Sequence, residues 1–339
     1  MRLIIDVMSG DAEPLEAVKG AFKALDELGC EITLVGNETS IKEAISTLSR
    51  SEEEIRIVNA ESVVTMEDDY LVVIKSKKNS SMSIGLSLLR DGEGDAFIST
   101  GNTGALVAGA TLILRKLKGV KAACIGAVLP LKNPVLLVDS GANVEPDAKS
   151  MHQFAVMGEV YARNMFNLGS PRVALINNGT EYTKGNALAR ETYAILKEDT
   201  DINFVGNVEG RDIVDDVCDV LVADGYTGNI ILKLVEGFGH YMSSTLKGLL
   251  FKNLKTKLGA IFLSGEAKAL KKSMDYTEYG GAPLLGVAKP VIKAHGNSNA
   301  KALFSACRQA IAFVETGIVS EIAEKAELWR NNRKEAEHE

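Results

Sequence analysis

Five short stretches rich in glycine, hydroxyl and amide side chains each follow a run of apolar residues. They are residues 8–11, 100–104, 139–143, 178–181 and 224–229. Glycine lets backbone N–H groups approach a phosphate closely, and the start of a helix supplies unpaired N–H donors at the positive end of a dipole. Any one stretch could be only a structural turn, but together they favour a site for a small oxyanion.

Lysine residues near these stretches would supply the positive charge of such a site. Lys184 stands where a helix is expected to begin, a position that cations usually avoid, so its presence there favours a role in binding an anion. A second group combines lysines with two hydroxyl side chains: Lys75, Lys77, Lys78, Ser80 and Ser81. The alternative interpretation of this group is a solvated loop. The side chain of His295 could donate a hydrogen bond to phosphate, or its hydrogen bonds could be satisfied within its own loop.

Apolar runs typical of buried strands alternate with helical patterns along most of the chain. The predicted strands span residues 3–7, 31–35, 55–58, 95–99, 123–129, 135–138, 172–177, 203–205 and 219–223, and the clearest helices span 13–28, 149–167, 184–197 and 299–316. This pattern predicts an α/β fold with a largely parallel sheet and helices on both faces. The five polar stretches, at the carboxyl ends of strands, would then converge on one crevice.

Composition limits the classes of function that fit the chain. It has 339 residues and a formal net charge of −7, a balance that does not favour nucleic acid as a partner. No apolar run of about 18 residues occurs, so no membrane span is predicted, and the N-terminus is too short and polar for a signal peptide. We predict a single α/β unit over residues 1–330, with two lobes as an option, and a charged, disordered tail over residues 331–339.

Several familiar catalytic motifs are missing from the sequence. It contains no GxSxG elbow, no GxxxxGK[ST] phosphate loop and no GxGxxG after a strand, so no nucleotide or other cofactor is expected. The four cysteines, Cys30, Cys124, Cys218 and Cys307, form no CxxC pair, which fits reduced thiols in the cytoplasm and no metal site. Three acids, Asp215, Asp216 and Asp219, resemble a metal cluster but are expected at a helix end before a strand.

Residues 245–263 combine lysines with leucine and phenylalanine and predict an amphipathic helix. Such a helix suits a membrane surface or an acidic partner. The predicted docking residues are Leu250, Leu254, Lys255, Lys257, Leu258 and Phe262, and Lys268, Lys271 and Lys272 follow them. Lys247 and Lys257 fall within the apolar arc of the helix. The alternative is therefore a dimer-interface helix with lysines at its edges.

Nine motifs, in order, resemble the phosphate acyltransferase family of bacterial lipid synthesis, often called PlsX. They are KKNSSM at residues 77–82, STGNTGA at 99–105, DSGAN at 139–143, QFAVMG at 153–158, EYTKGN at 181–186, NFVGNVEG at 203–210, DGYTGN at 224–229, GGAPLLG at 280–286 and HGNS at 295–298. The resemblance covers residues 1 to about 320, and so many motifs in order make it specific.

The resemblance implies a fold similar to phosphotransacetylase and to the isocitrate and isopropylmalate dehydrogenases. It implies a homodimer that transfers a long-chain fatty acyl group from acyl carrier protein to inorganic phosphate. The acyl phosphate product would serve a membrane-bound glycerol-phosphate acyltransferase in phospholipid synthesis. The protein would then be cytoplasmic and peripherally associated with the inner face of the cell membrane.

The sequence departs from the family pattern at two places. The first loop usually reads Gly-Gly-Asp-His, whereas this chain has Ala12 in place of the histidine. An Arg-Pro pair after a long helix is replaced by Lys121-Ala122. Any role of the histidine or the arginine in relatives is therefore in doubt here.

Phosphate is already partly a dianion at neutral pH, with a pKa not far from that of a phosphate ester at about 6, and it can attack a thioester without a strong general base. The leaving thiol has a pKa of about 8.5, so catalysis reduces to positioning and oxyanion stabilisation. The predicted catalytic residues are Lys184, Asn229 and His295, with Lys184 as the main charge. The predicted phosphate- and substrate-binding residues are Ser80, Ser81, Asn102, Thr103, Asn143, Asn186, Asn207, Asp224 and Gly225.

Three other functions stay open on the sequence alone. A phosphotransacetylase that uses acetyl-CoA would share the reaction type but would need a nucleotide pocket. A decarboxylating dehydrogenase of similar fold would need a metal site and an NAD site. A non-enzymatic scaffold for a carrier protein or a membrane would rely on the basic helix and would leave the polar stretches unexplained.

Overall fold

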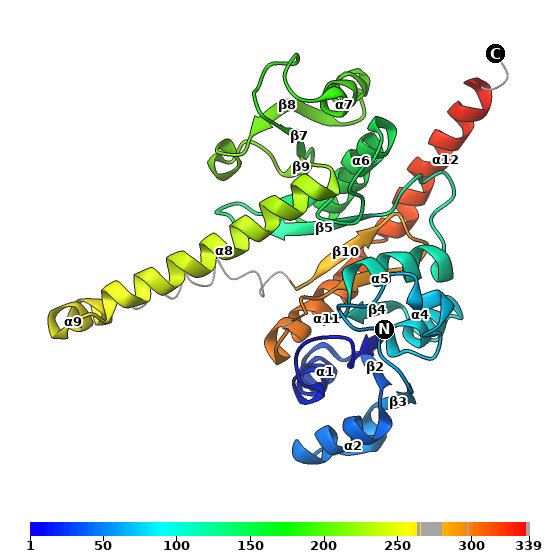
Figure 1. Ribbon diagram of the computed structural model, residues 1–339, viewed down its shortest axis with the longest axis vertical. Coiled ribbons are helices and arrows are strands. Elements are labelled where there is room, and N and C mark those ends of the chain that lie inside the picture. The colour runs from blue at the N-terminus through cyan, green and yellow to red at the C-terminus, as the bar shows by residue number, and fades with distance from the viewer. Residues whose placement is uncertain (263–264, 266–279, 297, 337–339) are drawn as a thin grey trace.

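The computed structural model describes residues 1–262, 265, 280–296 and 298–336 (Figure 1). Within these residues, strands form one mixed sheet in the order β3-β2-β1-β4-β11-β10-β5-β6-β9-β7-β8. The strands are β1 (Arg2–Asp6), β2 (Glu31–Gly36), β3 (Arg56–Asn59), β4 (Ala96–Ser99), β5 (Cys124–Leu129), β6 (Val135–Val138), β7 (Arg172–Asn177), β8 (Asn203–Glu209), β9 (Val220–Val222), β10 (Ala282–Leu285) and β11 (Val291–Lys293). The α/β fold expected from the sequence is confirmed.

Helices lie on both faces of this sheet. They are α1 (Pro14–Leu28), α2 (Glu38–Thr47), α3 (Val72–Lys75), α4 (Ser81–Arg90), α5 (Thr103–Gly109), α6 (Ala148–Met165), α7 (Ala187–Glu198), α8 (Gly225–Leu250), α9 (Leu254–Phe262), α11 (Ala300–Glu315) and α12 (Ile318–Ala336). Figure 1 shows α8 projecting away from the sheet, with α9 at its far end. Only the first part of α8 therefore packs on the body of the protein.

The sheet consists of two parallel sets of strands that run in opposite directions. One set is β3, β2, β1, β4 and β11, and the other is β6, β9, β7 and β8. Between them, β10 is antiparallel to both β11 and β5, and β5 is antiparallel to β6. The sheet is largely parallel as predicted, but its direction reverses at the centre.

Alternate residues of the strands enter different hydrophobic clusters, as the pleat of a strand requires. Leu3 and Ile5 of β1 pack with α1 and α11 on one face, whereas Ile4 packs with α4 and α5 on the other. In the second set, Leu136 and Leu137 of β6 separate in the same way. Both faces are therefore buried, which explains why the strands read as continuous apolar runs.

Three expected boundaries were wrong. The helix expected from Lys184 begins at Ala187, because Asn186 caps it by accepting the N–H of Ala189. The helix expected over residues 245–263 is divided, since α8 ends at Leu250 and α9 begins at Leu254. The tail expected to be disordered from residue 331 is helical to Ala336, in keeping with its helix-favouring Glu, Lys, Arg and Ala residues. Residues 263, 264, 268, 271, 272, 297 and 337–339 lie outside the described residues.

No single helix in the described part of the chain is both long and apolar enough to cross a membrane. The bent pair formed by α11 and residues 318–329 of α12 meets that test only when the two helices are counted together. Residues of α11 such as Leu303, Ala306 and Phe313 are buried in the core beside the sheet.

The start of α8 fits so closely against the loop after β6 that two of its residues have no room for a side chain. A Cβ on Gly228 would lie 1.9 Å from the carbonyl oxygen of Asp139, and one on Gly225 would lie 2.6 Å from that of Asn143. The Gly225 N–H also donates to the Asn143 carbonyl at 2.7 Å. These contacts fix α8 relative to β6.

Gly228→Ala should lower the free energy of unfolding by about 1–3 kcal/mol, because a backbone carbonyl must move to admit the methyl group. Gly239→Ala is the matched control, since it lies about three turns further along the same face of α8 with nothing within 4 Å of its Cβ position. The control should be stabilised by up to about 1 kcal/mol, because alanine favours a helix. Thermal unfolding followed by circular dichroism measures both; a shift of the same sign in both variants would contradict the packing argument.

Candidate active site

A cavity of 420 Å³ lies where the two strand sets meet. The register pairs Lys293 with Ala282, Leu284 with Ile125 and Gly126 with Val138. Because β10 and β11 are short, β11 and β6 end at nearly the same level although they run in opposite directions. The carboxyl ends of both sets therefore open into one space.

Four residues predicted from the sequence line this cavity. They are Thr103 after β4, Gly225 and Asn229 in the first turns of α8, and His295 after β11. Apolar side chains such as Ile125, Val128, Val144 and Leu232 form much of the remaining wall. The cavity thus combines a polar end with an apolar wall, an arrangement that suits a ligand with an anionic group and a hydrocarbon part.

Lys293 supplies a positive charge at the polar end of the cavity. Its ammonium group donates to the carbonyl oxygens of Ala294 at 2.5 Å and Thr100 at 3.3 Å. Burial and, to a smaller extent, the nearby charge of Lys233 lower the pKa of Lys293, and although Asp11, Asp6 and Glu236 oppose the shift, the pKa falls to about 8. The lysine is therefore still mostly protonated at pH 7 but loses its charge as the pH rises through about 8.

A second group of charges on α8 faces the same cavity. Lys233 pairs with Glu236 at 2.7 Å, and the Nε2 atom of His295 lies 3.8 Å from the same carboxylate. Burial raises the pKa of Glu236, but hydrogen bonding to His295 and Lys233 outweighs that effect and holds the pKa below its ordinary value. Glu236 is therefore ionised at neutral pH and links α8 to the loop after β11.

The loop that closes the cavity at the end of β6 is built around the buried carboxylate of Asp139. This carboxylate accepts N–H groups from Ile125, Gly141, Ala142 and Asn143 at 2.7–3.2 Å. Burial raises the pKa of Asp139, while these hydrogen bonds act in the opposite direction. The amide of Asn143 donates to Asp139 and to the Ala123 carbonyl. Asn143, predicted to bind substrate, thus has structural partners and is not among the residues that line the cavity.

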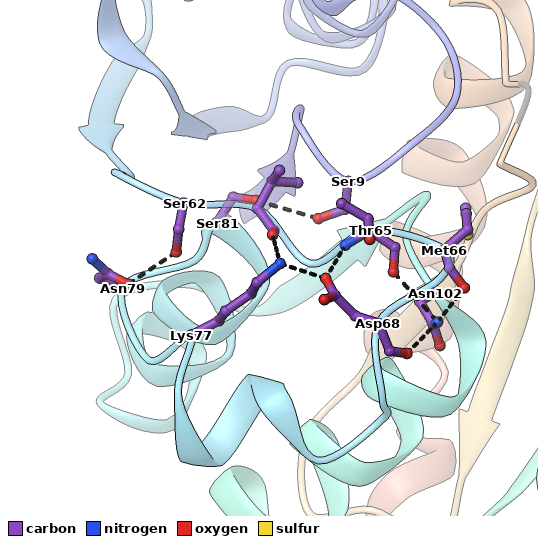
Figure 2. A network of polar contacts seen from close by, with 10 residues as sticks. Ser9, Ser62, Thr65, Met66, Asp68, Lys77, Asn79, Ser81 and Asn102 are labelled. Atoms are coloured by element: carbon purple, nitrogen blue, oxygen red, sulfur yellow. Dashed lines mark hydrogen bonds and ion pairs between the residues drawn. The ribbon is translucent and has the colours of Figure 1, made fainter.

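The amide group of Asn102 likewise holds a loop in place. It donates to the Met66 carbonyl at 3.1 Å and to those of Thr65 and Asp68 at 3.5 Å, while its oxygen accepts the Ala105 N–H (Figure 2). These bonds tie the loop at residues 65–68 to the start of α5. Asn102 is predicted to bind substrate from the sequence, and in the structure its side chain caps α5 and holds the loop at residues 65–68.

The lysine and serine group near residue 77 also has partners inside the protein. Lys77 pairs with Asp68 at 2.5 Å and donates to the Val63 carbonyl at 2.9 Å (Figure 2). The hydroxyl of Ser80 accepts the Ser83 N–H as the cap of α4, and that of Ser81 contacts the hydroxyl of Ser9 at 3.3 Å. Both serines are fully buried, so the loop must move before either can contact phosphate.

A second cavity of 440 Å³ lies on the other side of the start of α8. It is lined by Asn177 and Asn178 after β7, by Asn186, and by Asp224 and Thr227 at the start of α8. The stretch after β7 therefore does not converge on the first cavity as predicted. The reason is geometric, because α8 begins between the end of β7 and the end of β6.

Two further predicted residues lie near this second cavity but do not line it. Lys184 is exposed, and its backbone N–H and C=O bond to Glu181 and Asn177. The amide of Asn207 donates to the Glu181 carbonyl at 3.0 Å, while its buried Oδ1 atom has no partner among the residues described. Asn186 and Asp224 line the cavity but use their side-chain oxygens to cap α7 and α8.

The acids that resemble a metal cluster have an ordinary structural partner. Arg172 donates to Asp219 at 2.9 Å and to Asp216 at 2.7 Å, so both carboxylates already have a cationic partner. In the part of the chain that the structure describes, no three His, Cys, Asp or Glu side chains lie together as a metal site requires.

The predicted docking residues lie at the far end of α8 and on α9. Lys255, Lys257, Leu258 and Phe262 are exposed, with Leu258 62% and Phe262 89% accessible to solvent. Leu250, at the end of α8, is half-buried, and the side chain of Leu254 lies outside the described residues. Lysines and large apolar side chains thus share one exposed helix.

The sequence analysis missed Lys293, Lys233 and Glu236. Lys293 is the last residue of a short apolar strand and precedes the HGNS motif by two residues, so the motif drew attention to His295 and not to the strand before it. Lys233 and Glu236 follow the DGYTGN motif by one to two helical turns, so they could have been found by placing that motif at a helix start.

Comparisons with known proteins agree with this geometry. The family model described as "Fatty acid synthesis protein" matches residues 1–321. A phosphate acyltransferase of Caldanaerobacter subterraneus is 48% identical over 97% of this chain and 98% of its own length. Another phosphate acyltransferase, from Acetivibrio thermocellus, is 42% identical over 96% of each chain.

Solved structures show the same fold at low sequence identity. A phosphotransacetylase of Streptococcus pyogenes has a TM-score of 0.61 at 16% identity, covering 93% of this chain and 94% of its own. A branched-chain phosphotransacylase of Enterococcus faecalis has a TM-score of 0.60 at 16% identity, covering 93% of this chain and 99% of its own. A 4-hydroxythreonine-4-phosphate dehydrogenase of Klebsiella pneumoniae has a TM-score of 0.54 at 12% identity, covering 92% of this chain and 99% of its own. The solved structures show the shared fold, and the family model and the curated relatives show that the chain belongs to the phosphate acyltransferase family and is an acyltransferase.

Proposed function

We propose that this enzyme transfers a long-chain fatty acyl group from acyl carrier protein to inorganic phosphate in the 420 Å³ cavity. The observation that supports this proposal most directly is the cavity, where Asn229, His295 and Lys293 lie beside apolar wall residues. The polar end suits phosphate and the thioester carbonyl, and the apolar wall suits the start of a fatty chain. Family membership supports the reaction class.

The proposed reaction needs no cofactor to balance. A phosphate oxygen attacks the thioester carbonyl carbon, a C–O bond forms, and the carbonyl oxygen becomes an oxyanion. The C–S bond then breaks, the oxyanion returns to a carbonyl, and the carrier leaves as a thiolate, which takes a proton from water. Both the thioester and the acyl phosphate are activated acyl groups, so no ATP enters the reaction.

The residues would act by positioning and by charge. Asn229 would donate to the oxyanion from the first turns of α8, and His295 would be an accessory donor from the loop after β11. Lys184 would supply the main charge from the other side of the start of α8, where it is exposed. Such electrostatic stabilisation is the largest single contribution in many acyl-transfer enzymes.

The same proposal includes a homodimer that lies on the inner face of the cell membrane. Apolar side chains of α8 form an exposed stripe: Ile230, Leu234, Phe238, Tyr241 and Leu249. Their spacing of three, four or eight residues keeps them on one side of the helix, as expected of a helix that packs on a second copy. The lysines, Leu258 and Phe262 of α9 would contact anionic lipid or acidic carrier protein, and a glycerol-phosphate acyltransferase would consume the product.

The function is tested by measuring thiol release from acyl carrier protein loaded with different chains, in the presence of phosphate. Lys184→Ala should slow the reaction by roughly 100-fold or more, the usual cost of losing one oxyanion-stabilising group. Lys149→Ala, an exposed lysine at the start of α6, is the control and should keep full activity.

Three results would count against this proposal or a part of it. Acyl-CoA reacting as well as the carrier-bound substrate would favour a phosphotransacetylase, and no acyl phosphate from any donor would favour a scaffold. Near-normal activity of a folded Lys184→Ala variant would remove Lys184 from the mechanism.

The dimer is tested by sedimentation or light scattering of the Leu234→Glu/Phe238→Glu variant. Two charges in the centre of the apolar stripe should convert the protein to monomers, because a buried unpaired carboxylate is costly. Val205→Glu/Val214→Glu is the matched control, since both valines are exposed, neither belongs to α8, and the added charge is equal. A wild-type dimer unaffected by the α8 changes would locate the interface elsewhere.

Membrane contact is tested with vesicles that contain anionic lipid. Leu258→Glu/Phe262→Glu should reduce the bound fraction at least tenfold, because each apolar side chain loses about 1.5–3 kcal/mol of burial and each glutamate adds repulsion. The Val205→Glu/Val214→Glu protein again controls for charge and should bind as the wild type does. Equal binding by all three proteins would argue against docking through α9.

A further inference from the structure

We propose that Lys293 is the phosphate-binding residue of the cavity, with inorganic phosphate as its ligand. This inference rests on the proposed acyl transfer to phosphate, and it names a residue that the sequence motifs do not include. The first observation is the position of Lys293, which is the last residue of β11 and lines the polar end of the cavity beside His295.

Hydrogen bonds hold the ammonium group of Lys293 in place, and they occupy only some of its N–H donors. Its partners among the described residues are two carbonyl oxygens, those of Ala294 and Thr100. An ammonium has three N–H donors, so among the described residues one donor is left to point at a ligand. Because the carbonyls are neutral, the positive charge is oriented without being neutralised by a direct ion pair.

The position of the Thr100 carbonyl is itself fixed by the surrounding loops. A Cβ on Gly10 would lie 2.3 Å from Oγ1 of Thr100, so the loop after β1 packs closely against it. Two residues later, Asn102 is tied to the loop at 65–68, which the Lys77–Asp68 pair holds (Figure 2). The network drawn in Figure 2 therefore supports the carbonyl that orients Lys293.

Nearby acids do not cancel the charge, because most have other partners. Asp6 is buried and accepts Met8 N–H, Ser9 N–H and the Ser99 hydroxyl at 2.8–3.3 Å. Glu236 pairs with Lys233 and lies near His295. Asp11 is exposed to solvent, which screens its charge.

The pH dependence of phosphate binding should report the charge on Lys293. The pKa of Lys293 is lowered to about 8 by burial, with Lys233 adding to the shift and Asp11, Asp6 and Glu236 opposing it. Above pH 8 phosphate stays a dianion while Lys293 becomes neutral, so the affinity for phosphate should fall. A bound dianion raises the pKa of the lysine, so binding at pH 8.5 should take up protons from the buffer.

The test is calorimetric titration of the purified full-length protein with inorganic phosphate. Lys293→Met should weaken binding roughly 10- to 100-fold, the range for losing a charge-assisted hydrogen bond. Lys293→Arg should bind within a few-fold of wild type at pH 7 and lose the fall in affinity above pH 8, because guanidinium stays charged. Lys149→Met is the matched control and should bind phosphate normally.

Titrations at pH 8.5 in buffers of different ionisation enthalpy add a readout that a purely structural role of Lys293 would not change. Wild type should take up protons on binding phosphate, and Lys293→Arg should not. Circular dichroism checks that each variant is folded. Wild-type affinity in folded Lys293→Met, or no proton uptake by the wild-type protein, would overturn the inference.

The failure of this inference can be told apart from failure of the proposed function. If acyl transfer from the carrier protein occurs but Lys293→Met still binds phosphate normally, only the assignment of Lys293 is wrong. If Lys293→Met loses phosphate binding while no acyl donor reacts, the phosphate site stands and the proposed reaction fails.

Discussion

The buried carboxylate of Asp139 holds together the centre of this structure. It joins the start of β5, through Ile125, to the loop that follows β6, through three consecutive N–H groups. The backbone carbonyl oxygen of Asp139 lies so close to α8 that residue 228 must be glycine. One residue thus sets the geometry of β5, of the loop and of the first turn of α8. The cavity exists because these three elements cannot move independently.

The hydrogen bonds of the Asp139 carboxylate matter because the direction of the strands reverses near this point of the sheet. In a single parallel sheet, ligands bind beyond one shared edge. Here two parallel sets point in opposite directions, and their carboxyl ends meet only because β10 and β11 are short and pair with β5 in the observed register. The alternation of apolar runs and helices predicted the α/β class and most strands. It could not predict the reversal, because a buried strand reads the same in either direction.

The candidate site was harder to predict than the fold, for a reason visible in particular residues. Ser80, Asn102, Asn186 and Asp224 each accept a backbone N–H at the start of a helix. The residue types that bind phosphate are also those that cap helices, so a sequence cannot separate the two uses. Lys293 was missed for the opposite reason, since it reads as the end of an apolar strand, and only the pairing of β11 with β4 brings it to the Thr100 carbonyl.

Helix α8 connects the cavity to the exposed surface of α9 and limits what that surface can do. Its first turns carry Gly225 and Asn229 at the cavity, and its 26 residues span about 39 Å before α9 begins. A lipid or carrier held at Phe262 would therefore lie about the length of α8 away from Asn229 of the same copy. In the proposed reaction, contact through α9 would then tether the enzyme, and the thioester would need its own approach to the cavity between α8 and the sheet.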